Sequence, residues 1–208
     1  MTTKHATSGS NIQRLKDAVV SLSEADVFGL ARLEWDVVGR YEAPMGEGGT
    51  RCVCGHDPIS ECFKIRNREN GNVLEPIGNV CVRHFESFAM DSQMAALSGA
   101  ARVRAASAKL PDGETLPLRK DESPDGKTPF SRHAIEGLYL LGAFGPREKN
   151  GLEINSAETA CQTVLSAFNA RKPDSEQLRF AHAFVEARVR PFLAENTGAL
   201  ALRVTNHL

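Results

Sequence analysis

Cys52-Val-Cys-Gly-His56 begins a segment that holds four of the chain's five cysteines and that closes on Cys81-Val-Arg-His84. Thiolates and imidazoles are ligands that favour zinc over magnesium or calcium. A C-x-C-G turn, a hairpin-like stretch and a C-x-x-H motif at a helix start are together typical of a treble-clef zinc site. The sequence therefore predicts that this segment folds around a zinc ion.

Zinc in a structural site takes four ligands in a tetrahedron. Our predicted set is Cys52, Cys54, Cys81 and His84. His56 is the alternative fourth ligand, and Cys62 can enter only if its loop folds back toward the others. We otherwise expect Cys62 to be a small buried residue under the hairpin. Cys161 is alone on a predicted helix, so we expect it to belong to a core.

The cluster predicts a structural metal site rather than a catalytic one. A catalytic zinc keeps an open coordination position and usually has a general base beside it. Glu61 and Glu86 are near the ligands in sequence, but the chain has neither an H-E-x-x-H motif nor the H-x-E and P-C-x-x-C pair of zinc deaminases. We therefore expect the protein not to be an enzyme.

Hydrophobic periodicity predicts strands within the metal segment and helices on both sides of it. Residues 33–41 alternate between apolar and polar residues, as expected for a strand with one buried face. Asn70-Gly71 is a dipeptide preferred in two-residue hairpin turns, and it lies between the alternating segments 63–69 and 72–77. The helical segments are expected over 11–33, with a capped second start at 23–26, and over 81–97.

The chain changes character after residue 100. Residues 101–130 hold four of the ten prolines and two Asp-Gly pairs, which indicates a linker or a long surface loop. Apolar residues at helical spacing then predict three helices, over 131–144, 156–172 and 175–195. The predicted fold class is α+β. It has N-terminal helices, a strand and a treble-clef-like zinc region with a β-hairpin over 1–100, a linker or long loop over 101–130, and a C-terminal helical bundle over 131–208.

The composition limits the classes of function. The 208 residues carry a net charge of −1, so the protein lacks the general positive field that would draw nucleic acid to its whole surface. The chain has no apolar run as long as a membrane span and no apolar stretch near Met1, so we expect neither a membrane segment nor a secretory signal. The expected location is the cytoplasm, where clustered cysteines are more often metal ligands than disulfides.

A local basic surface, here called the basic ridge, is nevertheless predicted beside the metal. Its members lie on the first hairpin strand or next to metal ligands: Arg51, Lys64, Arg66, Arg68 and Arg83. Alternate residues of a strand project from one face. The ridge can therefore contact phosphates, with Asn67, Asn70 and Asn72 available to donate hydrogen bonds. The alternative is a solvated sheet face on which neighbouring glutamates offset the charge.

Several of these residues are arranged as in a known group of proteins. The shared pattern consists of Glu34-Trp35, Cys52-Val-Cys-Gly-His56, Ile65-Arg-Asn67, Asn70-Gly-Asn72 and Gly78-Asn-Val-Cys-Val82 followed by Phe85. The chain thus resembles uncharacterised zinc-finger proteins of phages, prophages and plasmids with a C-x-C-G-H and G-N-x-C-x-x-x-F motif. The resemblance covers residues 33–90 well and 155–190 loosely, and it implies zinc binding without a firm activity. In that family the position of His84 is often basic, which favours His56 as a ligand.

A second, weaker resemblance is architectural. A small zinc-finger domain joined to a helical bundle is similar to the large subunit of type IV CRISPR complexes. In those complexes the zinc part lies near the end of the guide RNA and the place where DNA enters. The likeness implies a subunit of a surveillance complex that contacts guide RNA and target DNA. The ligand spacing in this chain differs from the plain double C-x-x-C pattern.

We predict from these features a non-enzymatic, zinc-stabilised protein of a mobile-element or phage-related system. It binds nucleic acid, DNA or RNA, or serves as a subunit of a nucleoprotein complex with other proteins. The alternative is a protein-interaction adaptor or inhibitor that docks through the zinc hairpin. Salt dependence separates the two, because affinity for phosphates falls steeply as salt rises.

Overall fold

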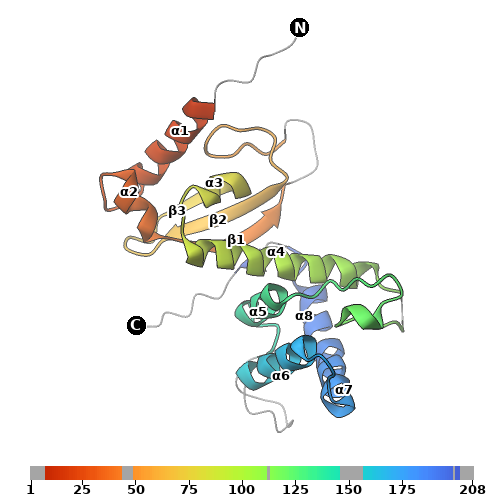
Figure 1. Cartoon of the computed structure of the whole chain (residues 1–208). Coiled ribbons are helices and arrows are strands. Elements are labelled where there is room, and N and C mark those ends of the chain that lie inside the picture. The colour runs from red at the N-terminus through yellow and green to blue at the C-terminus, as the bar shows by residue number, and fades with distance from the viewer. Residues whose placement is uncertain (1–7, 44–48, 112, 146–156, 199, 202–208) are drawn as a thin grey trace. The chain divides into compact units, whose positions relative to one another are not determined.

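The computed structural model describes residues 8–43, 49–111, 113–145, 157–198 and 200–201. Contacts divide the chain into two units, Met1–Met94 and Ala95–Leu208. The first unit holds an antiparallel sheet with helices, and the second is mostly helical (Figure 1). The predicted α+β fold class is therefore confirmed. Within the described residues, no helix has both the length and the apolar character that crossing a membrane requires.

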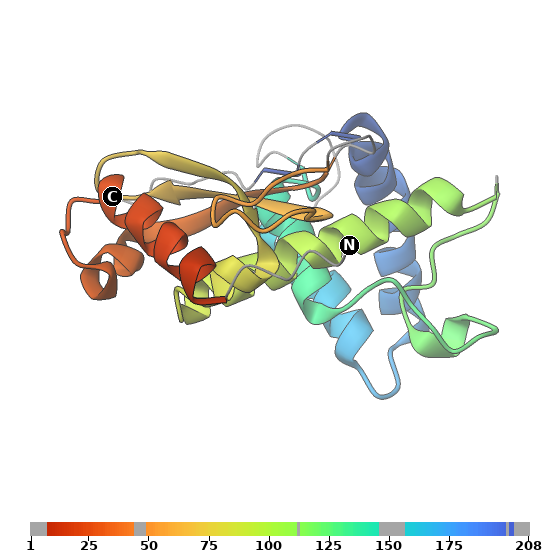
Figure 2. The same cartoon turned by 90° about the horizontal axis from the view of Figure 1, so that it is seen from above.

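The first unit begins with helices and then forms its sheet. Its elements are α1 (Ser8–Ser21), α2 (Phe28–Ala31), the 3-10 helix η1 (Arg32–Glu34), β1 (Trp35–Glu42), β2 (Glu61–Asn67), β3 (Val73–Gly78) and α3 (Asn79–Arg83). Helix α4 (Phe88–Lys109) starts in this unit and continues into the second. Figure 2 shows α4 as one continuous helix. The metal segment thus lies between β1 and α4.

The three strands of the first unit pair in the order β3-β2-β1 (Figure 1). Successive side chains of a strand point to opposite faces, and β2 accordingly buries Phe63, Ile65 and Asn67 in alternation. Pairing places Trp35 of β1 opposite Asn67, and Leu74 of β3 opposite Ile65. The predicted strand and the predicted β-hairpin are both confirmed.

The turn between β2 and β3 differs from the prediction. A two-residue type I′ turn needs a positive φ at both central residues, whereas Gly71 has a φ of +76° and Asn70 does not have a positive φ. The connection instead spans residues 68–72. The Asn67 side-chain oxygen accepts hydrogen bonds from the backbone N–H groups of Glu69 (2.8 Å) and Asn70 (3.3 Å). A side chain therefore supplies the acceptor around which this wider turn is built.

The predicted capped helix start at residues 23–26 is also wrong. The Ser23 hydroxyl donates back to the Val19 carbonyl (2.8 Å) and accepts a hydrogen bond from the Trp35 indole (2.9 Å). Helix α2 begins only at Phe28, and Val27 precedes it without a side-chain cap. The Ser23 hydroxyl thus bonds to a carbonyl of the last turn of α1 and to the tryptophan that starts β1. It does not cap a new helix.

The second unit consists of short helices joined to the latter part of α4. Its further elements are the 3-10 helix η2 (Lys120–Glu122), α5 (Arg132–Leu141), α6 (Ala157–Asn169), α7 (Ser175–Phe184), the π-helix η3 (Val185–Val189), α8 (Arg190–Glu195) and β4 (Leu200–Ala201). Helices α4 and α5 approach closely, since a Cβ on Gly99 would lie 2.7 Å from the Cα of Ala134. Ser156, the predicted start of the second C-terminal helix, lies outside the described residues.

Two boundaries around α4 differ from the sequence prediction. The single helix expected over 81–97 is two helices, α3 and α4. Glu86 between them has a φ of +50°, which interrupts the helical backbone conformation. Helix α4 then continues to Lys109, so the first part of the predicted linker over 101–130 is helical. The unit boundary, between Met94 and Ala95, falls inside α4 and before the predicted domain end at 100.

The rest of the predicted linker is packed against the second unit's helices. Leu116 and Leu118 are buried within it. The Arg119 guanidinium donates to the carbonyls of Ala167 (3.0 Å) and Ala170 (2.6 Å) at the end of α6. Those carbonyls have no partner within their own helix, so an arginine there satisfies groups that would otherwise need water. Leu116, Leu118 and Phe130 of this segment accordingly belong to the unit's core, while most of the residues around them stay exposed or half-buried.

Candidate metal centre

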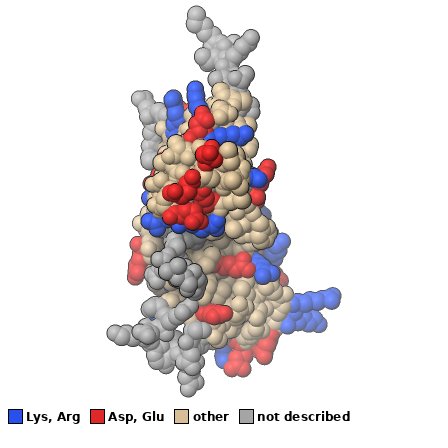
Figure 3. Space-filling model, turned by 90° about the vertical axis from the view of Figure 1, so that its left-hand side faces the viewer, with Lys and Arg blue, Asp and Glu red and all other residues tan. Residues whose placement is uncertain are grey.

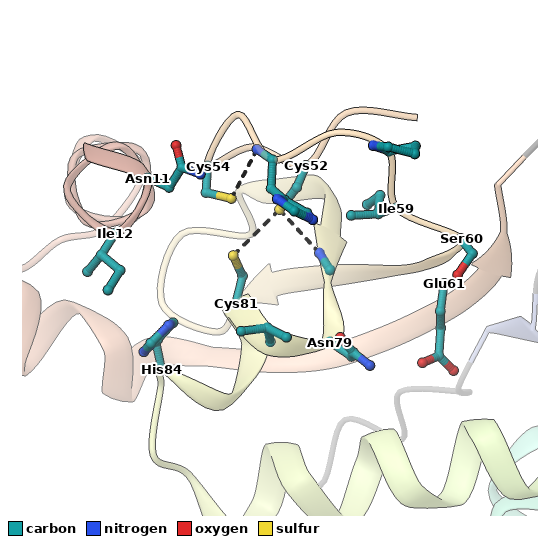
Figure 4. Close-up of a pocket in the computed structure, with 14 residues that line it drawn as sticks. Asn11, Ile12, Cys52, Cys54, Ile59, Ser60, Glu61, Asn79, Cys81 and His84 are labelled. Atoms are coloured by element: carbon teal, nitrogen blue, oxygen red, sulfur yellow. Dashed lines mark hydrogen bonds between the residues drawn. The ribbon is translucent and has the colours of Figure 1, made fainter. Parts of the chain in front are cut away.

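Three thiols converge in the first unit, and we call them the thiol cluster. Cys52 and Cys54 come from the loop before β2, and Cys81 comes from α3 directly after β3 (Figure 4). Their sulfur atoms all lie within 4.8 Å of one another. The side chains are 2%, 3% and 8% exposed, respectively. Segments far apart in sequence thus bring three soft ligands to one buried place.

The loop that carries two of these cysteines is a tight turn. The Gly55 N–H donates to the Cys52 carbonyl (2.7 Å), and the Cys52 N–H donates to the His56 carbonyl (2.9 Å). Gly55 has a φ of +88°, a conformation that side-chain-bearing residues rarely adopt. The Val53 N–H donates to the Pro76 carbonyl (3.0 Å), which ties the turn to β3. The turn is therefore fixed by backbone hydrogen bonds.

Backbone N–H groups point at two of the sulfurs. The His56 N–H lies 3.4 Å from the Cys54 sulfur, and the Gly78 N–H lies 3.3 Å from the Cys52 sulfur (Figure 4). Such donors stabilise negative charge on sulfur, and a metal-bound cysteine is a thiolate. One donor thus comes from the turn that carries Cys54 and the other from the end of β3.

The thiols perturb one another's protonation. Hydrogen bonding with the Cys81 thiol, helped by the backbone of Cys54 and Gly78 and opposed by burial, lowers the pKa of Cys52 to about 5. The same contact and burial raise the pKa of Cys81 well above its usual range. The opposite shifts follow from the closeness of the two sulfurs, and a thiolate at this place would be stabilised by a cation.

The spacing of the sulfurs fits a tetrahedral metal. The Cys52 and Cys81 sulfurs lie 3.6 Å apart. Two sulfurs bound to one zinc at 2.3 Å in a tetrahedron lie about 3.8 Å apart, whereas a disulfide bond is about 2.05 Å long. All five cysteines are free thiols. The three residues therefore fit a metal ion that prefers sulfur ligands.

The predicted fourth ligands lie outside this cluster. His84 and His56 both line the same cavity, but neither ring has a nitrogen within 4.8 Å of all three sulfurs. In Figure 4, His84 lies on the α1 side of the cavity, below Cys81. Cys62 is fully buried on β2, opposite Gly78 of β3, and it is also outside the cluster. The structure thus brings together three of the four predicted ligands.

Helix α1 contributes to the site in a way that the sequence did not indicate. Asn11 and Ile12 line the cavity beside the thiol cluster (Figure 4). The cavity has a volume of about 660 Å³. The Arg14 guanidinium packs on the turn, since a Cβ on Gly55 would lie 2.5 Å from its Nη1. These contacts join residues about forty positions apart, and neither motif nor periodicity predicts them.

Glu61 also lines the cavity, but it is held away from the sulfurs. Its carboxylate accepts a hydrogen bond from the Arg40 guanidinium at 2.7 Å. Figure 4 shows this carboxylate on the far side of the cavity and pointing away from the three cysteines. A general base would have to lie within hydrogen-bond reach of a metal-bound water. The Glu61 side chain does not hold that position.

Two members of the basic ridge are occupied by neighbours within the first unit. Lys64 forms an ion pair with Glu75 of β3 at 2.9 Å. Arg68 donates a short hydrogen bond to the Leu33 carbonyl and lies 3.7 Å from the Asp36 carboxylate. The charge of both residues is therefore offset locally, as the alternative of a solvated sheet face predicted.

The other three members are more accessible. Arg51 is exposed and lies 3.4 Å from Asp57, while Arg66 and Arg83 are exposed and form no ion pair with any residue that the structure describes. On the face drawn in Figure 3, Lys and Arg side chains are interspersed with Asp and Glu side chains. Arg66 and Arg83 are thus the ridge residues whose charge is least compensated.

The three hairpin asparagines are engaged in the fold. The side-chain amides of Asn67 (3.3 Å), Asn70 (3.1 Å) and Asn72 (3.1 Å) all donate to one acceptor, the Leu22 carbonyl after α1. Asn67 also donates to the Glu34 carboxylate at 2.6 Å. The expectation that these amides are available for phosphates is therefore wrong, because they bind the α1–α2 loop to the hairpin.

Glu34 is the centre of this network. Burial alone would raise the pKa of its carboxyl, but hydrogen bonds from Asn67 and from the backbone N–H groups of Glu24 (2.9 Å) and Ala25 (2.8 Å) hold that pKa below its usual value. A carboxylate that accepts several such bonds stays ionised. Glu34 and Asn67 are therefore structural residues.

Comparison with known proteins finds no matching family model, no matching curated protein and no matching solved structure. The resemblances drawn from the sequence motifs accordingly stay predictions.

Proposed function

We propose that the thiol cluster binds one zinc ion and that the first unit is a treble-clef-like fold built around it. Support comes from the three buried sulfurs that converge at tetrahedral spacing. The fourth ligand in this proposal is His84, which follows Cys81 by one helical turn and lines the same cavity. His56, on the turn itself, is the alternative.

The proposed zinc is structural, and the protein acts without catalysis. The cluster is buried, and the carboxylate nearest to it in the cavity lining is paired with Arg40 and turned away. Zinc here supplies folding free energy by joining the loop before β2 to α3. The convergence of Cys52, Cys54 and Cys81 is the single observation that carries this part of the proposal.

The proposed activity of the zinc-stabilised unit is binding of nucleic acid, DNA or RNA, alone or within a nucleoprotein complex. The contacts are assigned to Arg66 and Arg83, the members of the basic ridge with the least compensated charge, and to Arg51, which is exposed and lies at 3.4 Å from Asp57. Arginine suits this role because its fork of donors matches a phosphate. The phage- or plasmid-borne setting rests on the motif resemblance.

Replacing Arg66 and Arg83 together with alanine should weaken this binding. Each lost phosphate contact makes the negative slope of log affinity against log salt shallower by about one. The slope of the double variant should therefore be shallower by about two than that of the unchanged protein. The measurement is fluorescence anisotropy of the zinc-loaded protein with labelled single-stranded DNA, duplex DNA and RNA between about 50 and 200 mM salt. The matched control is Lys64→Ala, which removes a charge already paired with Glu75 and should change the slope less.

A second candidate function, a protein-interaction adaptor, is favoured by a separate observation. Val27, Leu30 and Leu33 are 52%, 59% and 54% exposed, and they recur every three residues around α2 and η1. Large apolar side chains gathered on a surface mark protein contacts more often than nucleic-acid contacts. If none of the three nucleic acids binds in a salt-dependent way, the nucleic-acid proposal fails and the adaptor takes its place.

A further inference from the structure

The thiol cluster contains a pair of sulfurs that are close enough to react with each other. Cys52 and Cys81 have their sulfurs 3.6 Å apart, and both are free thiols. Both residues line the cavity of about 660 Å³, so a small solute can approach them. Cys54 is in the same cluster, and its sulfur and that of Cys52 each accept a backbone hydrogen bond, so the 3.6 Å contact is what singles out Cys52 and Cys81. The close pair therefore joins the turn before β2 to α3.

We propose that Cys52 and Cys81 form a disulfide when a hydroperoxide oxidises the thiol cluster, and that this reaction releases the bound metal. The release rests on the proposed zinc centre. The disulfide itself does not, because the two sulfurs already lie together in the fold described here.

The reaction takes two steps. Both cysteines are thiolates when they bind the proposed metal, and that of Cys81, the more exposed of the pair, attacks one oxygen of hydrogen peroxide. A sulfur–oxygen bond forms, the oxygen–oxygen bond breaks, and hydroxide leaves, so that Cys81 becomes a sulfenic acid. The Cys52 thiolate then attacks the Cys81 sulfur, a sulfur–sulfur bond forms, and a second hydroxide leaves. The two thiolates lose two electrons in total, and these reduce the peroxide.

Loss of the metal follows from the ligand count. Zinc in a structural site needs four ligands, and the disulfide removes two of them at once. The first unit keeps a crosslink all the same, because the new bond joins the same two segments that the metal joined. Oxidation thus replaces a metal link by a covalent link between residues 52 and 81. A crosslink of this loop length stabilises a fold by restricting the unfolded chain.

The test uses the full chain loaded with zinc and treated with hydrogen peroxide. A zinc-sensitive dye follows release of the ion, and mass spectrometry of a non-reducing digest locates the linked peptides. We expect one zinc released per chain, the loss of two hydrogen atoms, and one linked peptide pair that contains Cys52 and Cys81. Dithiothreitol with added zinc should reverse all three changes. The oxidised, metal-free protein should keep more of the near-ultraviolet signal of Trp35 than the reduced, metal-free protein, because the crosslink restricts the unfolded chain.

Two variants make the result specific. Cys54→Ala keeps both sulfurs of the pair, so it should still form the 52–81 link, whereas loss of the link would assign the reaction to Cys54. Cys161→Ala removes a buried thiol of the second unit and should behave like the unchanged protein. If zinc is bound but peroxide yields no 52–81 link, the disulfide proposal is wrong and the metal centre stands. If no zinc binds, the metal centre fails, and the digest of the metal-free protein still decides the disulfide.

Discussion

Chelation of the metal is expected to unfold the first unit while the helices of the second unit stay folded. Structural zinc contributes on the order of 10 kcal/mol to folding, and a whole domain is stable by only about 5–15 kcal/mol. The segments that the metal would join have few other links, because α3 is five residues long and the loop before β2 is held by the bridge between Thr50 and Ile59 and by a backbone hydrogen bond from Val53 to Pro76 of β3. Removing the ion should therefore leave the sheet without its closing link.

The measurement is circular dichroism of the full chain during titration with a strong zinc chelator. We expect a large loss of the near-ultraviolet signal of Trp35, which is buried in the first unit's sheet, with most helical signal retained. Adding zinc back should restore the tryptophan signal. Cys81→Ala should behave like the chelated protein at every zinc concentration, while Cys161→Ala should respond like the unchanged chain. A chelated protein that melts at the same temperature as the loaded one would contradict a structural role for the metal.

Asn67→Ala is expected to destabilise the first unit by about 3 kcal/mol, because it leaves several buried groups without partners. Asn67 is fully buried, donates to the Leu22 carbonyl and to the Glu34 carboxylate, and accepts from Glu69 and Asn70. Among the residues that the structure describes, no other buried side chain of this network bonds both to the α1–α2 loop and to the hairpin turn.

Urea unfolding of the zinc-loaded protein, followed by tryptophan fluorescence, measures this effect. The matched control is Asn72→Ala, which removes an exposed amide with one side-chain hydrogen bond to the same Leu22 carbonyl. We expect the control to cost less than about 1 kcal/mol. Equal effects from both substitutions would show that the buried network does not hold the hairpin.

The sheet and the thiol cluster could be predicted because their signals are local. Alternation over β1 and β2 identifies strands through the two-residue period of the backbone. The C-x-C-G and C-x-x-H motifs lie at the two ends of one hairpin, and a hairpin necessarily brings its ends together. The convergence of Cys52, Cys54 and Cys81 can therefore be predicted from the sequence.

The missed features depend on contacts between distant segments. Nothing local distinguishes an asparagine that binds phosphate from one that binds the Leu22 carbonyl, so Asn67 was misread. No periodic sequence pattern predicts that Leu116 and Leu118 are buried, because their segment has no regular secondary structure. Arg119 holds this segment to the end of α6. The compensation of Lys64 by Glu75 depends on strand register, which composition does not reveal.

His84 shows where sequence reasoning about ligands ends. Its spacing from Cys81 is that of many zinc ligands, yet its ring lies outside the group of sulfurs. The His84 side chain would have to change its rotamer to coordinate a metal ion at the thiol cluster, and binding of the ion would stabilise that rotamer. The backbone and the motif define the candidates, and the choice between His84 and His56 needs the bound ion.

Zinc-edge X-ray absorption of the purified full chain, together with its metal content, is the decisive test for a metal centre at the thiol cluster. We predict one zinc per chain, bound by three sulfurs at about 2.3 Å and one nitrogen at about 2.0 Å. The nitrogen should be lost in His84→Ala, and if it persists there and is lost in His56→Ala, His56 is the ligand. A protein that binds no metal, or whose zinc has only oxygen and nitrogen neighbours, would contradict a metal centre at Cys52, Cys54 and Cys81.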